Sequence, residues 1–296
     1  MNIGAVERET GLSKDILRTW ERRYGFPTPA RDVNGERVYS AEQVDRLLRI
    51  KRLMDQGHRP GRLIAARGED LAALALRRTS VPGTAPQPEA DELDGLLTLL
   101  THHDAAGYHH AMQQRLVRQG LQRFVEHTVA PLTRKVGDAW AEGRLEVFEE
   151  HLFTELTKRL LRQAIATLPT ARRGPRVVLT SVPEEPHLLG LLMVEALLAL
   201  EGADCVPLGT QMPVLEIARA TAAHRADIVA LSFSAAFPAR QIPGVLEHLR
   251  TLLPAEVALW AGGSGLRRTL PPKGVLLLFG LAEAVDALAA WRVSHA

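Results

Sequence analysis

A histidine with the surroundings of a metal ligand stands in the hexapeptide EPHLLG, residues 185–190. A neutral imidazole is a common metal ligand, and a nearby carboxylate can hold its second ring nitrogen and set its basicity. Glu185 is placed for that role, two residues before His187. A lone histidine after a strand is also often a hydrogen-bonded turn residue, so the hexapeptide alone leaves both interpretations open.

Small side chains recur at three places in the second half of the chain, separated by 41 residues (191–231) and then by 27 (235–261). Residues of this size leave a slot beside a sheet in which a bulky ligand could lie. We therefore expect them to line one binding site together with the histidine. They are Gly190, Ser232, Ser234, Gly262 and Gly263.

The segments that must position these residues alternate between short apolar runs and helix-length stretches from residue 174 onward. This alternation predicts a doubly wound parallel sheet, a Rossmann-like fold in which ligands bind at the carboxyl ends of the strands. EPHLLG follows the first strand, so the fold would bring the small residues and the histidine to one edge. The expected strands are 176–182, 202–209, 226–234, 257–263 and 274–280, and the expected helices are 188–201, 213–224, 240–252 and 281–291.

A second candidate group lies in residues 91–170, whose apolar positions recur at helical spacing and predict a bundle of about four helices. Trp140 would end one helix at the turn AEGR (141–144), and Glu150 and His151 would lie on the next. The three side chains could then face one cavity. A buried tryptophan beside a surface Glu-His pair is the alternative.

The first 67 residues are basic, with 14 Lys and Arg against 9 Asp and Glu, while the rest of the chain has 22 against 25. Residues 3–26 read as helix, glycine turn and second helix, which predicts a helix-turn-helix, followed by a hairpin turning at Asn34-Gly35. Basic side chains on the second helix suit phosphate and guanine contacts, although a solvated basic helix would look similar. The residues expected to contact DNA are Lys14, Arg18, Arg22, Arg23, Tyr24, Arg31, Arg37 and Tyr39.

The chain of 296 residues is long enough for two or three domains. Residues 79–90 are rich in Pro, Gly, Ser and Thr, which predicts a flexible linker. We therefore expect a multidomain α and α/β protein: a DNA-binding domain at 1–78, the bundle at 91–170 and the sheet domain at 171–296.

Composition argues against several classes of protein. The single cysteine, Cys205, excludes an internal disulfide and is expected to be a small buried side chain. No apolar run is long enough for a signal peptide or a membrane span, so we expect a cytoplasmic protein without a membrane partner. The sequence contains no arrangement of a nucleophile with a base and no phosphate-binding loop, so we do not expect an enzyme. The histidine pairs at 102–103 and 109–110 suggest a transition metal only weakly.

Residues 2–67 resemble the winged-helix DNA-binding domain of the mercury-resistance-regulator (MerR) family. The sequences WERRYG (20–25) and GERVY (35–39) carry the resemblance. It implies a dimer that binds a pseudo-palindromic operator in double-stranded DNA. The usual dimerisation helix is absent from the pattern after Arg67, so another surface would have to pair the subunits.

The spacing in the second half is similar to the motif of cobalamin-binding domains, Asp-x-His-x-x-Gly, then Ser-x-Leu, then Gly-Gly. The resemblance implies that His187 ligates cobalt from below and that the small residues accommodate the nucleotide tail. Glu185 replaces the usual Asp and keeps the carboxylate on a longer side chain. Ser234 replaces the usual Leu and still leaves room.

Trp140, nine residues and then Glu150-His151 resemble the signature of the cobalamin-binding bundle in light-sensing CarH/LitR-type regulators, a resemblance that spans nearly the whole chain. It implies that the tryptophan covers the upper face of the corrin and that the Glu-His pair holds an upper ligand such as adenosyl. In light-sensing members a histidine follows the tryptophan and ligates cobalt after photolysis. Here that residue is Ala141, which has no ligating atom.

Together the resemblances imply a cobalamin-binding transcriptional regulator, and a repressor is the leading interpretation. Adenosylcobalamin is favoured over methylcobalamin as the cofactor. Its homo-oligomerisation, as dimer or tetramer, and its operator binding would depend on the cofactor, with light as a further candidate signal. A corrinoid methyl carrier is one alternative and predicts no DNA-binding module. A MerR-type regulator that senses another ligand or a protein partner is the other and predicts no bound cobalt.

Overall fold

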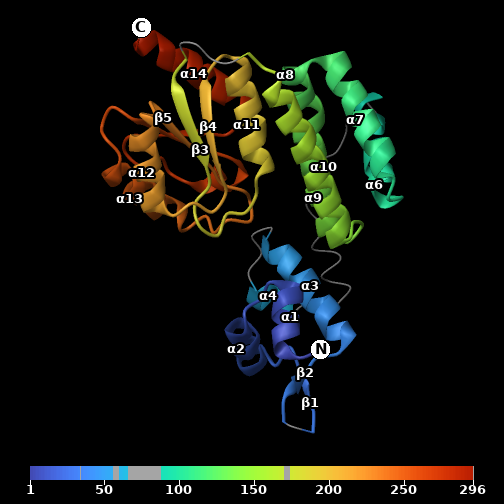
Figure 1. The fold of residues 1–296 in the computed structure, drawn as a ribbon. Helices are drawn as coiled ribbons and strands as arrows, with labels where there is room; N and C mark the ends of the chain where they lie inside the picture. The colour runs from blue at the N-terminus through green and yellow to red at the C-terminus, as the bar shows by residue number, and fades with distance from the viewer. Residues whose placement is uncertain (34, 56–59, 66–87, 170–173, 296) are drawn as a thin grey trace. The chain divides into compact units, whose positions relative to one another are not determined.

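The computed structural model describes residues 1–33, 35–55, 60–65, 88–169 and 174–295 (Figure 1). The described residues form two compact units. One holds the N-terminal winged helix and residues 138–146, and the other holds the rest of the bundle and the sheet domain. Within the described ranges, no helix combines the length and the apolar character needed to cross a membrane.

The N-terminal unit contains the predicted helix-turn-helix and a two-stranded antiparallel wing. Gly11 takes a left-handed conformation (φ 67°) at the turn, and the Ser13 hydroxyl caps the second helix by accepting from the Ile16 amide at 3.3 Å. Leu17, Trp20 and their neighbours form a core of their own. The elements are α1 (Ile3–Thr10), α2 (Lys14–Tyr24), β1 (Ala30–Arg31), β2 (Arg37–Val38), α3 (Ala41–Asp55) and α4 (Pro60–Ala65).

The predicted bundle is present, with one irregularity. Its third helix consists of an α-helical turn, a π-helical stretch and a second α-helix. In the π-helical stretch, Val125–Val129, each backbone hydrogen bond spans one residue more than in an α-helix. The first helix begins at Pro88, inside the expected linker, and the remainder of that linker (79–87) lies outside the described residues. The elements are α6 (Pro88–Thr101), α7 (Ala105–Gln119), α8 (Leu121–Phe124), η1 (Val125–Val129), α9 (Ala130–Ala141) and α10 (Val147–Ala166).

The sheet domain confirms the predicted doubly wound fold. Five parallel strands follow the order β4-β3-β5-β6-β7. Figure 1 shows α12 and α13 on one face, and separate apolar cores lie on the two faces of the sheet. The strands are β3 (Arg176–Thr180), β4 (Asp204–Gly209), β5 (Ile228–Ser232), β6 (Ala258–Gly262) and β7 (Val275–Leu278), and the helices are α11 (Leu189–Leu200), α12 (Val214–His224), α13 (Ile242–Leu252), η2 (Ser264–Arg268) and α14 (Leu281–Ser294).

An ion pair joins the bundle to the sheet domain where α10 packs against α11. Glu195 is the only charged residue of α11 and is 4% exposed. Its two carboxylate oxygens lie 2.9 and 2.8 Å from Nη1 of Arg162 on α10. A carboxylate buried among apolar side chains needs such a partner, and Arg162 supplies it across the contact between the two helices.

Candidate functional site

Glu185 and His187 form a carboxylate–imidazole pair at the carboxyl end of β3. Nδ1 of His187 lies 2.6 Å from Oε1 of Glu185, and the Ser234 amide donates to Oε2 at 2.6 Å. Glu185 is 1% exposed. Burial alone would raise its pKa, but the hydrogen bonds from His187 and Ser234 outweigh burial and lower the pKa. The carboxylate is therefore an anion that orients the imidazole.

This arrangement selects one tautomer of His187. An anionic acceptor at Nδ1 keeps the proton there, which leaves the lone pair on Nε2. The imidazole is 56% exposed, while its carboxylate partner is buried. A ring held in this way suits ligation of a metal by Nε2, and the chemistry of this donor pair therefore fits the cobalt ligand implied by the sequence.

A buried serine that the sequence motif did not indicate ties this pair to a neighbouring loop. The hydroxyl of Ser181, 0% exposed, donates to the Glu185 carbonyl at 2.5 Å and accepts from the Gln211 amide at 3.0 Å. Gln211 itself takes a left-handed conformation (φ 61°). Ser181 lies inside the expected strand 176–182, so no sequence signal singled it out, whereas the observed strand β3 ends one residue before it.

The expected small residues come together at the same edge of the sheet, but they do not all leave open space. Ser232 pairs with Gly262 across β5 and β6, and a Cβ on Gly190 would lie 3.0 Å from the Ser232 hydroxyl. A Cβ on Gly263 would lie 2.2 Å from the Phe233 carbonyl oxygen. Backbone fills the space in that one direction, so Gly263 must be glycine for local packing, and its part in a ligand slot stays a prediction.

Replacing Gly263 by alanine should therefore damage the domain. Gly263 has φ 115° and ψ 171°, a conformation that essentially only glycine adopts, and the added methyl group would collide with backbone. We expect Gly263→Ala to lower the free energy of unfolding by more than about 2 kcal/mol, measured by urea denaturation. Gly244→Ala in α13, where nothing lies near a Cβ, should instead raise it by about 0.5–1 kcal/mol.

The predicted bundle residues lie where α9 ends and α10 begins. Trp140 is in the last turn of α9 and is half-buried. On α10, Oε1 of Glu150 accepts from the Thr154 hydroxyl at 2.8 Å, and His151 is exposed. Trp140 belongs to one compact unit and the Glu-His pair to the other, so their common cavity stays a prediction.

The adjacent residue Glu149, which the sequence did not single out, pairs with one of the bundle histidines. Its carboxylate is buried, and Oε1 lies 3.1 Å from Nε2 of His103. The His103 ring also packs against Phe148, with 5.3 Å between ring centroids. Within the described ranges, no three metal-binding side chains gather. The histidine pairs at 102–103, in the turn after α6, and at 109–110, on α7, therefore gain no support as a metal site.

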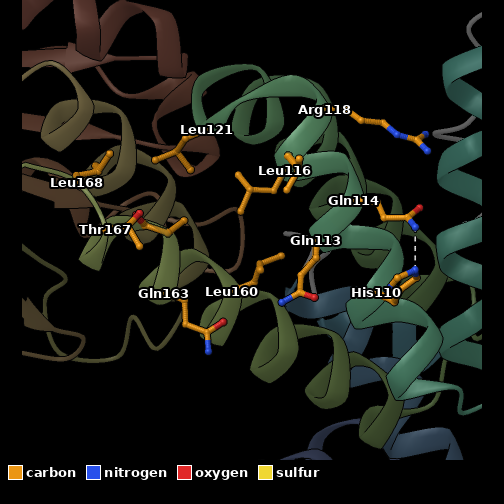
Figure 2. A pocket seen from close by; sticks show the side chains of 12 residues that line it. His110, Gln113, Gln114, Leu116, Arg118, Leu121, Leu160, Gln163, Thr167 and Leu168 are labelled. Carbon is orange, nitrogen blue, oxygen red and sulfur yellow. Dashed lines mark hydrogen bonds between the residues drawn. The ribbon is translucent and has the colours of Figure 1, made fainter.

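A groove of about 650 Å³ lies between α7, α8 and the end of α10 (Figure 2). Leu116, Leu121 and Leu160 supply its apolar lining, with Gln113 and Gln163 among its polar residues. None of the residues expected to bind cofactor lines this groove.

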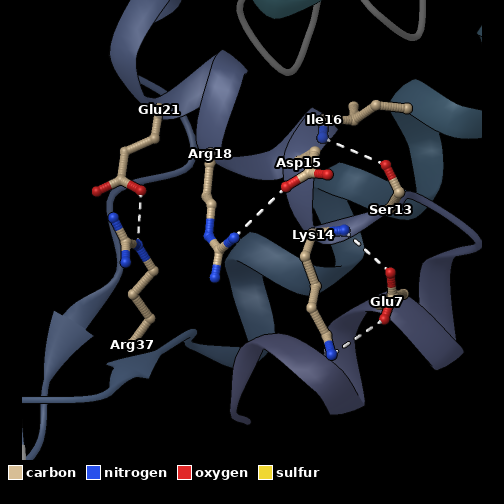
Figure 3. A network of polar contacts seen from close by, with 8 residues as sticks. All are labelled: Glu7, Ser13, Lys14, Asp15, Ile16, Arg18, Glu21 and Arg37. Atoms are coloured by element: carbon tan, nitrogen blue, oxygen red, sulfur yellow. Dashed lines mark hydrogen bonds and ion pairs between the residues drawn. The ribbon is translucent and has the colours of Figure 1, made fainter.

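The expected DNA-contact residues of α2 and the wing are mostly exposed, and three of them pair with acidic side chains (Figure 3). Lys14 lies 3.6 Å from Glu7, Arg18 lies 3.4 Å from Asp15, and Arg37 lies 2.8 Å from Glu21. The Arg37 pair connects the wing to α2. Arg22 and Arg23 are exposed, Tyr24 is 37% exposed beneath the Arg23 guanidinium, and Arg31 donates to the Gly35 carbonyl at 2.6 Å.

The wing hairpin differs in detail from the prediction. Ala30 pairs with Val38 and Arg31 with Arg37. Residues 32–36 therefore connect the two strands, a longer loop than a two-residue turn. Gly35 has φ 78°, and its partner in the expected turn, Asn34, lies outside the described residues.

Tyr39 does not belong to the DNA surface that the sequence predicts. Its side chain is 1% exposed within the winged-helix core, so the expectation of a DNA contact is wrong. The buried hydroxyl has no hydrogen-bond partner among the described residues. The aromatic ring packs in the core of the winged helix, so Tyr39 is buried although it lies next to the wing in the sequence.

Removing the Tyr39 hydroxyl should stabilise the protein. We expect Tyr39→Phe to raise the free energy of unfolding by about 1 kcal/mol, because the buried hydroxyl loses its hydration without gaining a partner. DNA affinity should stay unchanged. Tyr108→Phe is the matched contrast, since that buried hydroxyl lies 2.9 Å from the Thr157 hydroxyl and its removal should cost about 1 kcal/mol. A loss of DNA affinity in Tyr39→Phe would contradict the core assignment.

Comparisons with known proteins identify the family. The MerR HTH family regulatory protein model matches residues 1–63, and the B12 binding domain model matches residues 92–165. The chain is 30% identical over 268 residues to the HTH-type transcriptional repressor CarH of Myxococcus xanthus, covering 90% of this chain and 89% of that one. It is 32% identical over 273 residues to the repressor CarA of the same organism, covering 91% and 88%. The chain belongs to the CarH and CarA family of HTH-type transcriptional repressors.

Membership of the CarH and CarA family confirms the resemblance expected from the sequence. With the two domain matches, it makes the chain a transcriptional regulator that carries a DNA-binding and a B12-binding module. The solved monomethylamine corrinoid protein of Methanosarcina barkeri has a similar fold, with a TM-score of 0.54 and 15% identity over 68% of this chain and 99% of that one. That likeness concerns the fold alone.

Proposed function

We propose that the protein is a repressor whose binding to operator DNA is controlled by cobalamin. The observation that carries this proposal is the hydrogen-bonded series from the Ser234 amide through Glu185 to His187 at the ligand-binding edge of the sheet. Such a series prepares an imidazole for a metal, and it lies in a chain whose N-terminal unit has the fold of a DNA reader.

In this proposal, each residue at the edge of the sheet has a separate task. Nε2 of His187 would ligate the cobalt, and Glu185 would keep the proton on the opposite nitrogen. Ser181 fixes the backbone that carries Glu185. Ser232 and the glycines at 190 and 262 keep bulk away from the strand ends. When bound, cobalamin would supply a cobalt centre that carries a cobalt–carbon bond.

Residues of the bundle would also contact the cofactor. Trp140 offers an apolar surface, and Glu150 and His151 offer hydrogen-bonding groups, which favour adenosylcobalamin over methylcobalamin. Ala141 excludes a second histidine ligand from that position. We therefore propose that occupancy by the cofactor is the signal, and that any response to light proceeds without a ligand from residue 141.

DNA would be bound by a homo-oligomer in the cytoplasm. Two copies of α2 would occupy successive major-groove half-sites, as in other helix-turn-helix proteins. We propose that cobalamin promotes the dimer or tetramer. The DNA unit would then gain affinity through simultaneous contacts rather than through new ones.

The test is a titration of the purified chain with adenosylcobalamin and, separately, methylcobalamin in the dark. Absorption spectra report cofactor binding, and gel-shift assays on the DNA upstream of the protein's own gene report DNA binding at each occupancy. We expect bound cobalamin and tighter DNA binding with the adenosyl form. Retained cobalamin without any DNA binding would favour a corrinoid carrier. DNA binding without retained cobalamin would leave a regulator of another signal.

A further inference from the structure

An acidic side chain stands exposed on the helix expected to enter the major groove. Asp15 lies in the first turn of α2, and its side chain is 90% exposed. Residues near the start of the second helix of a helix-turn-helix are those that reach base edges. A carboxylate in this place is repelled by phosphates, so it weakens DNA binding unless it meets a hydrogen-bond donor.

Folding gives only a modest reason for this carboxylate, because an acid in the first turn of a helix is favoured by the helix dipole by about 0.3–1 kcal/mol. The Ser13 hydroxyl already caps α2 by accepting from the Ile16 amide. Asp15 accepts from Nη1 of Arg18 at 3.4 Å, but both side chains are exposed, and ion pairs of that kind contribute little to stability. The unbound helix therefore explains an acid in this turn only in part, and the Asp15 side chain is 90% exposed.

The other acids near α2 are engaged differently. Glu7 accepts from the Lys14 amide at 3.0 Å, and Glu21, 30% exposed, pairs with Arg37 of the wing at 2.8 Å. These two contacts join α2 to α1 and to β2. Asp15 makes no such connection between elements in the contacts of the described unit, and Figure 3 shows it beside Arg18 on the same helix.

Base chemistry restricts what the carboxylate could accept from. In the major groove, cytosine presents only its N4 amino donor, whereas adenine presents its N6 donor beside the N7 acceptor. A carboxylate, which has acceptors only, is repelled by N7 and so favours cytosine over adenine. Arg18, one turn along and close to the same carboxylate, suits O6 and N7 of a guanine.

We propose that Asp15 is a specificity-determining residue of the DNA surface. Its carboxylate accepts a hydrogen bond from the N4 amino group of one cytosine in each half-site, and Arg18 contacts a neighbouring guanine. Sites that lack this cytosine are disfavoured because the carboxylate then faces acceptors or phosphates. The inference rests on the proposed function only in requiring that the chain binds specific DNA.

The experiment selects duplexes from a randomised pool with the full chain, in adenosylcobalamin and darkness. Wild type is compared with Asp15→Ala, Asp15→Asn and the control Glu9→Ala, which removes an exposed charge of the same sign from α1. We expect wild type to prefer cytosine at one position of each half-site by about tenfold or more. Asp15→Ala should lose that preference alone, and Asp15→Asn should shift it to adenine, which a carboxamide binds through N6 and N7.

The possible outcomes separate the inference from the proposed function. If all four proteins select the same sequence, Asp15 does not determine specificity and the inference fails. The inference also fails if Asp15→Ala, with an unchanged circular dichroism spectrum, loses selectivity at every position, because the residue then orients the helix. If wild type selects no sequence at all, the proposed function fails and the inference falls with it.

Discussion

Replacing His187 by alanine is expected to weaken the binding of adenosylcobalamin by more than about 100-fold. Loss of a residue that only orients a metal ligand typically weakens binding 10- to 100-fold, and loss of the ligand itself should do more. The absorption spectrum of the mixture in darkness should stay that of the free cofactor. The free energy of unfolding should also fall, by about 1–3 kcal/mol near neutral pH, because the buried Glu185 carboxylate loses its imidazole partner. Cofactor binding is therefore compared under conditions in which circular dichroism shows both proteins to be folded.

Two further variants make this result specific. Glu185→Gln presents an amide N–H to Nδ1 of His187, which favours the tautomer with its proton on Nε2 and should weaken binding roughly 10- to 100-fold. His248→Ala, on the exposed surface of α13, should bind like wild type. If His187→Ala binds adenosylcobalamin as tightly as wild type does, His187 is not the cobalt ligand.

The second large effect is expected at the contact between bundle and sheet domain. Arg162→Met should lower the free energy of unfolding near neutral pH by about 2 kcal/mol, because it leaves the Glu195 carboxylate buried without its cation. We place the effect below the range for fully buried pairs because the arginine side chain is 40% exposed. Urea denaturation measures the change, and Arg159→Met on the exposed side of α10 should have little effect.

The pH dependence gives this prediction a sign. Burial raises the pKa of Glu195, and Arg162 offsets part of that rise. A carboxyl group whose pKa is higher in the folded state lowers stability once pH exceeds its unfolded value, and the loss grows until pH passes the folded value. Without the arginine the folded pKa rises further, so the deficit of Arg162→Met should be small near pH 4 and largest near pH 8, both approximate.

The double variant Arg162→Met/Glu195→Gln supplies the control for charge. It removes both ionised groups, so its stability should no longer fall as pH rises through this range. It should also recover most of the loss, since a neutral amide is less costly to bury than an unpaired carboxylate. An equal deficit at all pH values in the single variant would show that packing, rather than the buried charge, sets the effect.

The sheet domain is the part of the fold most open to prediction from sequence. Buried parallel strands are short continuous apolar runs, and each is followed by a helix of limited length. The predicted helix 213–224, for example, corresponds to Val214–His224, and the predicted strand 274–280 contains Val275–Leu278. Helical periodicity likewise indicates the bundle. A π-helical stretch has no characteristic amino-acid composition, so the sequence does not predict one.

The candidate site could be predicted only where the signal is local. Glu185 and His187 are two residues apart, and their hydrogen bond is implied by that spacing. The Ser234 contact is different, since the backbone amide donates and the side-chain type at 234 does not encode the bond. The partner of Glu195 is 33 residues away on another element. The sequence therefore shows a single charge in an apolar helix but does not indicate that Arg162 pairs with it. The burial of Tyr39 depends on core packing in the same way.

The π-helical stretch in the bundle has a consequence for how the chain tolerates insertions and deletions. It holds one residue more than an α-helical turn would, while Leu132, Val136 and Ala139 beyond it still face the core. Deleting one residue within Val125–Val129 would restore regular helix and leave those three on the same face. Deleting one residue between Leu132 and Val136 would instead turn everything after it by about 100°. Homologous chains should therefore differ in length by one residue at the first place and not at the second.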